Sequence, residues 1–144
     1  MGSRASRAGP ASLITLDTSA VVALADRKDR GHAACRDALG ADPGPYFVPA
    51  GILAEIGYML GRAAGSTALD AFLLTIERSE VTLDCGDEDI PRVRELVSRY
   101  ASLRLGIADA CVVACAERNS SRVLTLDRRH FDVVSRDIAL ELLP

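Results

Sequence analysis

The protein has 144 residues and a mass of 15.3 kDa, a length that fits one compact domain. Hydrophobic residues make up 49% and charged residues 26% of the chain, which excludes disordered, collagen-like and disulfide-scaffold proteins. The net charge of −3 argues against a protein that coats nucleic acid through its overall charge, but it does not exclude a local basic groove.

Residues 1–12 are rich in glycine, serine and arginine and lack an apolar core. We therefore predict a disordered tail over residues 1–12 and a single domain over residues 13–144. No apolar run reaches the roughly 18 residues that a membrane span needs, so we expect a cytoplasmic protein that makes no membrane contact.

The cysteines are predicted to be small apolar core residues rather than ligands of a zinc ion. Only one pair is closely spaced, and neither a second pair nor a nearby histidine completes four ligands. The four positions are Cys35, Cys85, Cys111 and Cys115.

Predicted strands and helices alternate along the chain. In order, the patterns predict a strand at 13–16, helices at 20–26 and 31–39, a strand at 46–48, helices at 50–62 and 68–78, a strand at 81–83, helices at 87–100 and 107–118, and strands at 123–126 and 138–143. Gly65 and Ser66 separate the two middle helices. This alternation predicts an α/β fold, a three-layer α/β/α sandwich with a central parallel sheet.

Three of the predicted strands end in the same pattern, Thr-Leu-Asp, at Asp17, Asp84 and Asp127. The carboxyl ends of parallel strands share one edge of the sheet, and open α/β sheets bind ligands there. An aspartate at a strand end also caps the next helix, which would explain any one of the three. Their repetition favours a functional site that is lined with carboxylates.

Two further acids lie within apolar helical segments: Glu55 in ILAEIGY and Asp109 in GIADACVVA. A carboxylate that is buried without a partner costs several kcal/mol, so each of these acids is expected to have a cation beside it. No lysine or arginine lies at an obvious partner spacing, and Mg²⁺ or Mn²⁺ would fill the role because both take oxygen ligands. For Glu55 alone, an exposed helix acid or an arginine pair explains the position equally well.

Together, Asp17, Glu55, Asp109 and Asp127, at separations of 38, 54 and 18 residues, resemble the acidic quartet of PIN-domain ribonucleases. More closely, the chain resembles the VapC toxins of type II toxin–antitoxin pairs. The similar segments are LDTSA at the first acid, AEI at the second, GIADA at the third and LTLDRRHF at the fourth. The resemblance runs from about residue 13 to about residue 143.

The resemblance implies an endoribonuclease that depends on Mg²⁺ or Mn²⁺ and leaves a 5′-phosphate and a 3′-hydroxyl. Asp17 and Asp109 match the principal metal ligands of the family. Glu55 and Asp127 match the acids that complete the metal site, partly through water.

Other residues near the acids are less clearly assigned. Thr18 and Ser19 match a hydroxyl position beside the first acid, where the resemblance implies a supporting role, although simple helix capping explains them equally well. Asp84 has no counterpart in the quartet, despite its matching strand end.

Arginines near the acids are expected to hold the RNA, because carboxylates that face a polyanion need local compensation. Arg128 and Arg129 follow the last acid and Arg104 precedes the third, although each also fits an exposed charged turn. Aromatic residues make up only 4% of the chain, so a base-stacking platform is not expected. The sequence does not discriminate among transfer RNA, a ribosomal RNA loop and messenger RNA, or between one and two metal ions.

The resemblance also implies a protein partner, a cognate VapB-like antitoxin. We expect one of its arginines to insert among the acids and a short helix to cover apolar surface around Leu24, Met59 and Leu60. A homodimer is expected as well, because helices 52–60 and 68–76 offer more apolar surface than one sheet of this size covers.

Other functions fit the sequence less well. A receiver-type phosphoacceptor domain needs a lysine at the carboxylate edge, and the only lysine, Lys28, lies past the first helix. A haloacid-dehalogenase-like phosphatase needs a second aspartate two residues after Asp17, where Ser19 stands. His32 and His130 form no obvious acid–base pair of the kind that a metal-free ribonuclease uses. The remaining alternative is a catalytically silent PIN-like module that binds RNA or protein.

Overall fold

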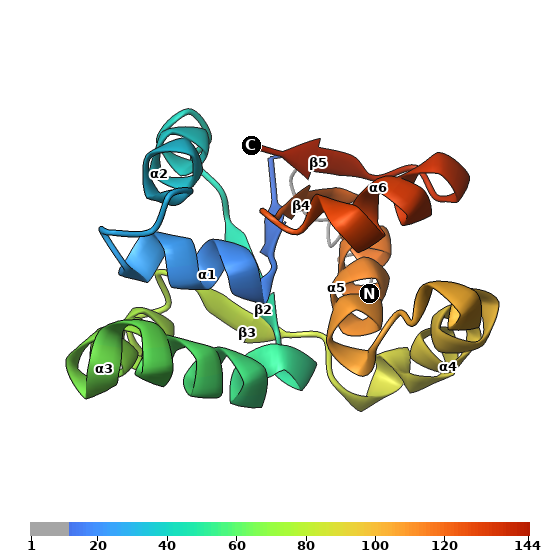
Figure 1. Cartoon of the computed structure of the whole chain (residues 1–144), viewed down its shortest axis with the longest axis horizontal. Helices are drawn as coiled ribbons and strands as arrows, with labels where there is room; N and C mark the ends of the chain where they lie inside the picture. The colour runs from blue at the N-terminus through green and yellow to red at the C-terminus, as the bar shows by residue number, and fades with distance from the viewer. Residues whose placement is uncertain (1–11) are drawn as a thin grey trace, which may run out of the picture.

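The computed structural model describes residues 12–144 and is built on five parallel strands (Figure 1). The strands are β1 (Ile14–Leu16), β2 (Tyr46–Pro49), β3 (Thr82–Asp84), β4 (Arg122–Leu124) and β5 (Glu141–Leu143). Their order is β3-β2-β1-β4-β5, with Ile14 opposite Tyr46 and Leu16 opposite Leu124. β1 is therefore the central strand, flanked by β2 and β4.

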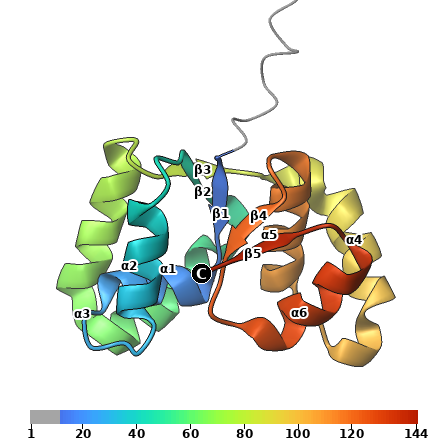
Figure 2. The same cartoon turned by 90° about the horizontal axis from the view of Figure 1, so that it is seen from above.

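Helices cover both faces of this sheet. They are α1 (Thr18–Ala25), α2 (His32–Gly40), α3 (Leu53–Glu77), α4 (Ile90–Arg99), α5 (Ile107–Arg118) and α6 (Arg128–Asp137), with short 3₁₀ turns η2 at 50–52, η3 at 87–89 and η4 at 101–103. Figure 2 shows α1, α2 and α3 on one side of the strands and α4, α5 and α6 on the other. The predicted three-layer α/β/α sandwich is confirmed.

The three central strands are short and largely buried, as expected for a parallel sheet that is covered on both faces, whereas the edge strands β3 and β5 are partly exposed. Ile14, Val48 and Leu124 in the three central strands are fully buried. Residues 110–116 of α5 are also buried, which explains why this helix is apolar on every side. The core therefore extends to both sides of β1. The first turn of α5 lies outside the buried stretch and carries Asp109 to the edge of the sheet.

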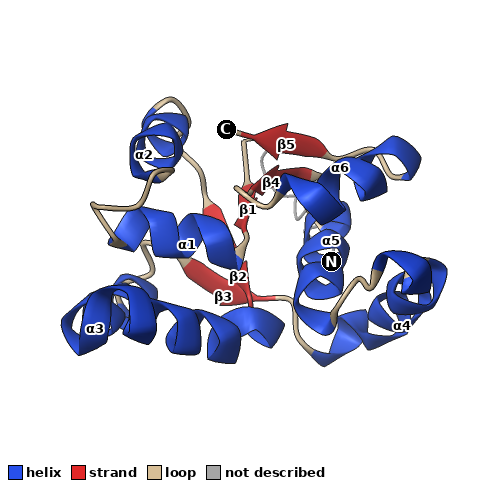
Figure 3. Ribbon diagram, in the orientation of Figure 1, coloured by secondary structure: helices blue, strands red, loops and turns tan. Residues whose placement is uncertain are grey.

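The structure differs from the predicted elements near the carboxyl end of the chain. Residues 128–137 form α6, a helix that was not predicted, and β5 begins at Glu141 rather than at residue 138 (Figure 3). Phe131 and Val134 are fully buried, whereas the arginines and aspartates of α6 are exposed. A helix is recognised in a sequence from apolar residues that recur at helical spacing. Two core residues, three positions apart, are too few to show that recurrence.

The two predicted middle helices are joined in α3, but the joint is a kink. Gly65 has φ 84° and ψ −178°, a backbone conformation that a helix cannot contain and that glycine adopts at little cost. The predicted break at Gly65 is therefore present as a change of direction between two helical halves.

The predicted tail lies outside the described residues, apart from Ser12. The Ser12 hydroxyl donates a hydrogen bond to the carbonyl of Gly44 at 2.7 Å. Within residues 12–144, no helix is both long enough and apolar enough to cross a membrane.

Two of the four cysteines are joined in a disulfide, so the prediction that all four are apolar filler is wrong. Cys85, in the turn after β3, is bonded to Cys115 on α5, with 5.5 Å between their Cα atoms. Cys35 and Cys111 are free and buried, as predicted. The bonded pair is 30 residues apart, and only the packing of the turn after β3 against α5 brings the two residues together.

Candidate active site

The four predicted carboxylates line one pocket at the carboxyl edge of the sheet. The pocket has a volume of about 480 Å³. It is lined by Asp17, Thr18, Ser19, Val22, Glu55, Tyr58, Met59, Asp109 and Asp127. Acids from four separate segments of the chain are therefore brought together, and we call this pocket the acidic pocket.

Strand order explains why the first and last acids meet. Asp17 directly follows β1, and its N–H donates a hydrogen bond at 3.0 Å to the carbonyl of Leu124, the last residue of β4. Asp127 follows β4 and directly precedes α6. Because β1 and β4 are parallel neighbours, both acids lie at the same edge of the sheet.

Glu55 and Asp109 reach the pocket from opposite sides of the sheet. Each lies in the first turn of its helix, α3 or α5, where the helix dipole favours a negative charge. Gly51, in η2 just before α3, allows the two helices to approach closely. A Cβ atom at this position would lie only 2.6 Å from Sγ of Cys111, two residues after Asp109.

Two hydroxyl groups hold one oxygen of Asp17, which is almost fully buried. Ser19 Oγ donates to Asp17 Oδ2 at 2.9 Å, and Thr125 Oγ1 donates to the same oxygen at 2.8 Å. These hydroxyls accept hydrogen bonds from the N–H groups of Leu126 and Asp127 respectively. Each hydroxyl has one proton, so both protons serve Oδ2, and Oδ1 is the oxygen that can bind a cation.

Thr18 and Ser19 do not cap α1 with their side chains. Ser19 instead supports the carboxylate of Asp17, as described above. Thr18 Oγ1 is buried without a hydrogen-bond partner within residues 12–144, although Thr18 lines the acidic pocket. An unpaired buried hydroxyl costs about 1–3 kcal/mol, so this group favours a hydrated ion or a polar ligand beside it.

His130, on α6, contacts the second principal acid. Its Nδ1 atom lies 2.8 Å from Oδ2 of Asp109, and the two side chains are only 19% and 18% exposed. One ligand atom from each of Asp109, Asp127 and His130 lies within 4.8 Å of the others. The acidic cluster therefore includes an imidazole.

Burial raises the pKa of both principal acids. For Asp17, burial is the largest cause of a pKa above the ordinary 3.8; hydroxyl donors oppose this effect, and the negative charge of Asp109 adds to it. For Asp109, burial again raises the pKa, the contact with His130 lowers it, and the charges of Asp127 and Glu55 raise it. The acids therefore repel one another, and a cation in the pocket would relieve that repulsion.

Glu55 is exposed, so of the two interpretations that the sequence left open, the exposed helix acid is confirmed and burial does not require a cation beside it. Because Glu55 lies on the outer side of α3, its charge stays in water and does not need a partner. It still lines the acidic pocket. Glu55 is therefore assigned to the site because it lines the pocket, and not because it is buried.

The predicted RNA-binding arginines do not line the acidic pocket. Arg128 pairs with Asp132 at 3.4 Å and donates to the carbonyl of Pro144 at 3.1 Å. Arg104 and Arg129 are exposed. A role in RNA binding stays a prediction for all three.

The residues of the acidic pocket fit a divalent metal ion. Within the described chain, no lysine or arginine forms an ion pair with any of the four acids. Carboxylate oxygens are the ligands that Mg²⁺ and Mn²⁺ prefer. The unpaired hydroxyl of Thr18 adds a further oxygen close to these acids.

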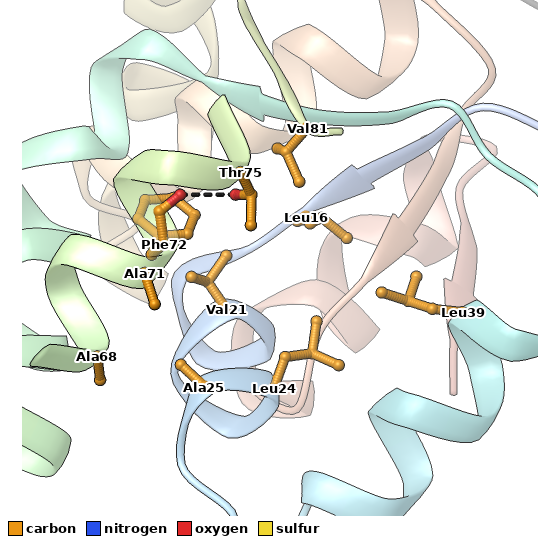
Figure 4. A pocket seen from close by; sticks show the side chains of 10 residues that line it. All are labelled: Leu16, Val21, Leu24, Ala25, Leu39, Ala68, Ala71, Phe72, Thr75 and Val81. Atoms are coloured by element: carbon orange, nitrogen blue, oxygen red, sulfur yellow. Dashed lines mark hydrogen bonds between the residues drawn. The ribbon is translucent and has the colours of Figure 1, made fainter. Parts of the chain in front are cut away.

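A second cavity, of about 240 Å³, is apolar (Figure 4). It lies between α1, α2 and the second half of α3 and is lined by Leu16, Val21, Leu24, Ala25, Leu39, Ala68, Ala71, Phe72, Thr75 and Val81. Thr75 donates its hydroxyl to the carbonyl of Phe72 at 2.6 Å, so its polar group is satisfied. This cavity carries no titratable side chain and suits an apolar group rather than chemistry.

The prediction that Leu60 is part of the antitoxin surface is wrong. Leu60 is fully buried, because it lies on the side of α3 that packs in the core. Leu24 lines the apolar cavity and Met59 lines the acidic pocket, so these two positions remain accessible.

Sequence analysis missed three residues that contribute to the site. Thr125 had a signal, because it occupies the repeated Thr-Leu-Asp pattern that identified Asp127. His130 lies within the segment LTLDRRHF, which carried the family resemblance. Tyr58 is three residues after Glu55, so helical spacing places both on one side of α3.

Comparisons with known proteins identify the family of this chain. The PIN domain profile matches residues 14–137. Ribonuclease VapC26 of Mycobacterium tuberculosis is 34% identical over 121 residues, which cover 83% of this chain and 90% of that protein. The crystal structure of Mycobacterium tuberculosis VapC20, a sarcin–ricin loop cleaving toxin, has the same fold, with a TM-score of 0.74 and 21% identity over 84% of this chain and 94% of that one. The chain therefore belongs to the PIN-domain family and, within it, to the VapC ribonucleases.

Proposed function

We propose that the protein is a metal-dependent endoribonuclease toxin that acts in the cytoplasm. The observation that carries this proposal is the convergence of four carboxylates in one pocket, without a paired lysine or arginine in the described chain. The similarity to Ribonuclease VapC26 over most of the chain supports RNA as the substrate.

The proposed reaction is hydrolysis of a phosphodiester bond. A bound Mg²⁺ or Mn²⁺ would supply Lewis-acid activation of water and neutralise the scissile phosphate. Asp17 and Asp109 would hold the ion, each through the oxygen that the chain leaves free. Glu55 and Asp127 line the same pocket and would complete the site by accepting hydrogen bonds from water.

The bonds that change determine the products. Oxygen from water forms a bond to phosphorus, and the bond between phosphorus and the 3′ oxygen breaks. The departing 3′ oxygen takes up a proton. The products are therefore one strand with a 3′-hydroxyl and one with a 5′-phosphate.

The direct test is to sequence RNA 5′-phosphate ends after brief induction of the protein, and to repeat the cleavage in vitro with and without EDTA. Asp17→Asn should reduce cleavage about a hundredfold or more, because a catalytic ion contributes several kcal/mol to the transition state. Asp84→Asn is the matched control. It ends a strand in the same Thr-Leu-Asp pattern but lies outside the acidic pocket.

The same test distinguishes the proposed nuclease from the alternative function, a catalytically silent binding module. Cleavage that is unchanged in EDTA or in the Asp17→Asn variant would contradict a metal-dependent nuclease. Metal-independent RNA binding without any cleavage would support the silent binding module.

We also propose an antitoxin partner for the same surface. A basic side chain placed among Asp17, Glu55 and Asp109 would form charge-assisted hydrogen bonds and exclude the metal ion. Apolar anchors of the partner would contact Leu24 and Met59, which line the apolar cavity and the acidic pocket respectively.

Titration calorimetry with the antitoxin encoded beside the protein separates these contacts. Leu24→Arg should chiefly weaken antitoxin binding and spare cleavage, because Leu24 does not line the acidic pocket, whereas Asp109→Asn should abolish cleavage and only weaken binding. Loss of all affinity in Asp109→Asn, with no loss in Leu24→Arg, would show that the acids alone hold the partner.

A further inference from the structure

The proposed mechanism leaves one polar contact of the acidic cluster without a role, the contact between His130 and Asp109. Nδ1 of His130 lies 2.8 Å from Oδ2 of Asp109, a normal distance for a charge-assisted hydrogen bond. An ionised carboxylate can only accept hydrogen bonds. With Asp109 in the ionised form that a metal ion needs, the contact requires a proton on Nδ1, and the imidazole is then the donor.

The fold of α6 holds this imidazole in place. α6 begins directly after Asp127, and Phe131, the residue after His130, is fully buried. Asp127 is the N-cap of α6 and His130 is its third residue, so both lie at the start of this helix, beside Asp109. The close approach of their ligand atoms, within 4.8 Å, agrees with this placement.

The two principal acids are held in a similar way. Ser19 and Thr125 donate to Oδ2 of Asp17, and His130 donates to Oδ2 of Asp109. In both acids, one oxygen is bound by the chain, and the other is left for a ligand. A carboxylate held at one oxygen cannot rotate freely, so its second oxygen has a defined direction.

Resting on the proposed function, we propose that His130 is a positioning residue that orients Asp109 for metal binding through its Nδ1–H group. It also links α6 to α5, so that Asp127 and Asp109 keep a fixed separation. In this role His130 binds the carboxylate and not the ion. Groups that orient metal ligands by hydrogen bonding typically change metal affinity by about 10-fold to 100-fold when they are removed.

The rival role for His130 is direct ligation of the metal through Nε2. Two amide substitutions distinguish the roles, because each reproduces one of the imidazole nitrogens. The side-chain NH₂ of asparagine lies near the position of Nδ1, and that of glutamine near the position of Nε2. His130→Asn should therefore keep the hydrogen bond to Asp109, while His130→Gln and His130→Phe should lose it.

The measurement is Mn²⁺ binding without RNA, followed by the electron paramagnetic resonance signal of free Mn²⁺. His130→Phe and His130→Gln should bind Mn²⁺ about 10-fold to 100-fold more weakly than the unaltered chain. His130→Asn should bind Mn²⁺ nearly as tightly as the unaltered chain. His32→Phe is the matched control, because Nδ1 of His32 also makes a 2.8 Å contact, to the carbonyl of Ala23, but outside the acidic pocket.

A metal-free measurement keeps the inference testable if His130→Phe does not fold. Long-range ¹H–¹⁵N spectra of the unaltered chain in EDTA should show the His130 imidazole with its proton on Nδ1. A proton on Nε2 alone would overturn the inference. So would full Mn²⁺ affinity in His130→Phe, or rescue by His130→Gln and not by His130→Asn. Failure of the unaltered chain to bind Mn²⁺ at all would instead refute the proposed function.

Discussion

Asp17 and Asp109 are carboxylates whose pKa values are raised by burial, so the folded chain disfavours the ionised form that a metal ion needs. Hydrogen bonds from Ser19, Thr125 and His130 offset part of this effect. Functional sites commonly keep such locally unfavourable groups at a cost to stability. The cation that completes the site should therefore also stabilise the fold.

Replacement of Asp17 by asparagine should stabilise the metal-free protein. Because the folded-state pKa of Asp17 is raised, its contribution to stability is fully present below the ordinary pKa of 3.8 and is lost as pH rises through the folded value. Asp17→Asn removes that loss of stability. The Tm of the variant should therefore exceed that of the unaltered chain, by an amount that grows to a few degrees between about pH 4 and about pH 8. Thermal melts in EDTA measure this difference.

The same variant should lose the response to metal. Mn²⁺ should raise the Tm of the unaltered chain at neutral pH, because an ion that binds only the folded state stabilises it by mass action. Asp17→Asn should show little or no rise. An equal rise in both proteins would mean that the ion binds elsewhere.

Gly51 allows the close approach of the two elements that carry Glu55 and Asp109. Gly51→Ala would place a methyl group 2.6 Å from the sulfur of Cys111, so either the Cys111 side chain or the two elements η2 and α5 must shift. We expect a loss of about 1–3 kcal/mol in stability and weaker Mn²⁺ binding. Gly57→Ala, within α3, is the control, because apart from the adjacent residues and backbone of α3 itself no atom lies within 4 Å of its new methyl group.

The control should change in the opposite direction. An alanine in a helix interior is more favourable than glycine by about 0.5–1 kcal/mol, so Gly57→Ala should be slightly more stable. Chemical denaturation and Mn²⁺ titration of both variants test the pair. If Gly51→Ala keeps full Mn²⁺ affinity, the spacing of α3 and α5 does not determine the metal site.

The disulfide between Cys85 and Cys115 ties the turn after β3 to α5. A bond that closes a loop of 30 residues should stabilise the fold by about 3–4 kcal/mol through the lost freedom of the unfolded chain. Dithiothreitol should lower the free energy of unfolding by this amount. The same reagent should leave a Cys85→Ala/Cys115→Ala variant unchanged. An unchanged free energy of unfolding in the unaltered chain would show that the bond does not form in solution.

Some helices and strands could be predicted from the sequence, and others could not. β1 was predictable because an apolar run ends in an acid, and α5 because its apolar residues continue for three turns. α6 was not, since only Phe131 and Val134 face the core. Without α6, nothing in the sequence places His130 beside Asp109. The four acids were found because they end strands or interrupt apolar helices, whereas the supporting Thr125 and His130 depend on contacts between distant segments.

The topology of the whole sheet determines where the site lies. The chain winds from β1 through β2 to β3 in one direction and then returns to add β4 and β5 on the other side of β1. In parallel sheets, the crevice at such a reversal lies outside the carboxyl ends of the two central strands. Asp17 follows β1 and Asp127 follows β4, so two of the four acids occupy this position before any helix is considered.

The apolar surface that remains exposed is smaller than the sequence predicts. Ile56, Leu60 and Phe72 of α3 are buried in the core, so they are not available to a second copy. Tyr58 and Leu73, on the two halves of the same helix, remain 62% and 45% exposed. A homodimer thus stays a prediction, and these exposed residues of α3 define the surface that it would use.

A dimer through α3 should depend on Leu73, which lies away from the acidic pocket. Light scattering at micromolar concentration should give a particle of twice the 15.3 kDa chain mass. Leu73→Arg would place a charge within an apolar contact, which is costly without a partner, and should give the monomer. Because Leu73 is exposed in the single chain, this variant should keep its fold and its Mn²⁺ affinity. A 15.3 kDa particle for the unaltered chain would refute the dimer, and a dimer that survives Leu73→Arg would exclude this half of α3 as its interface.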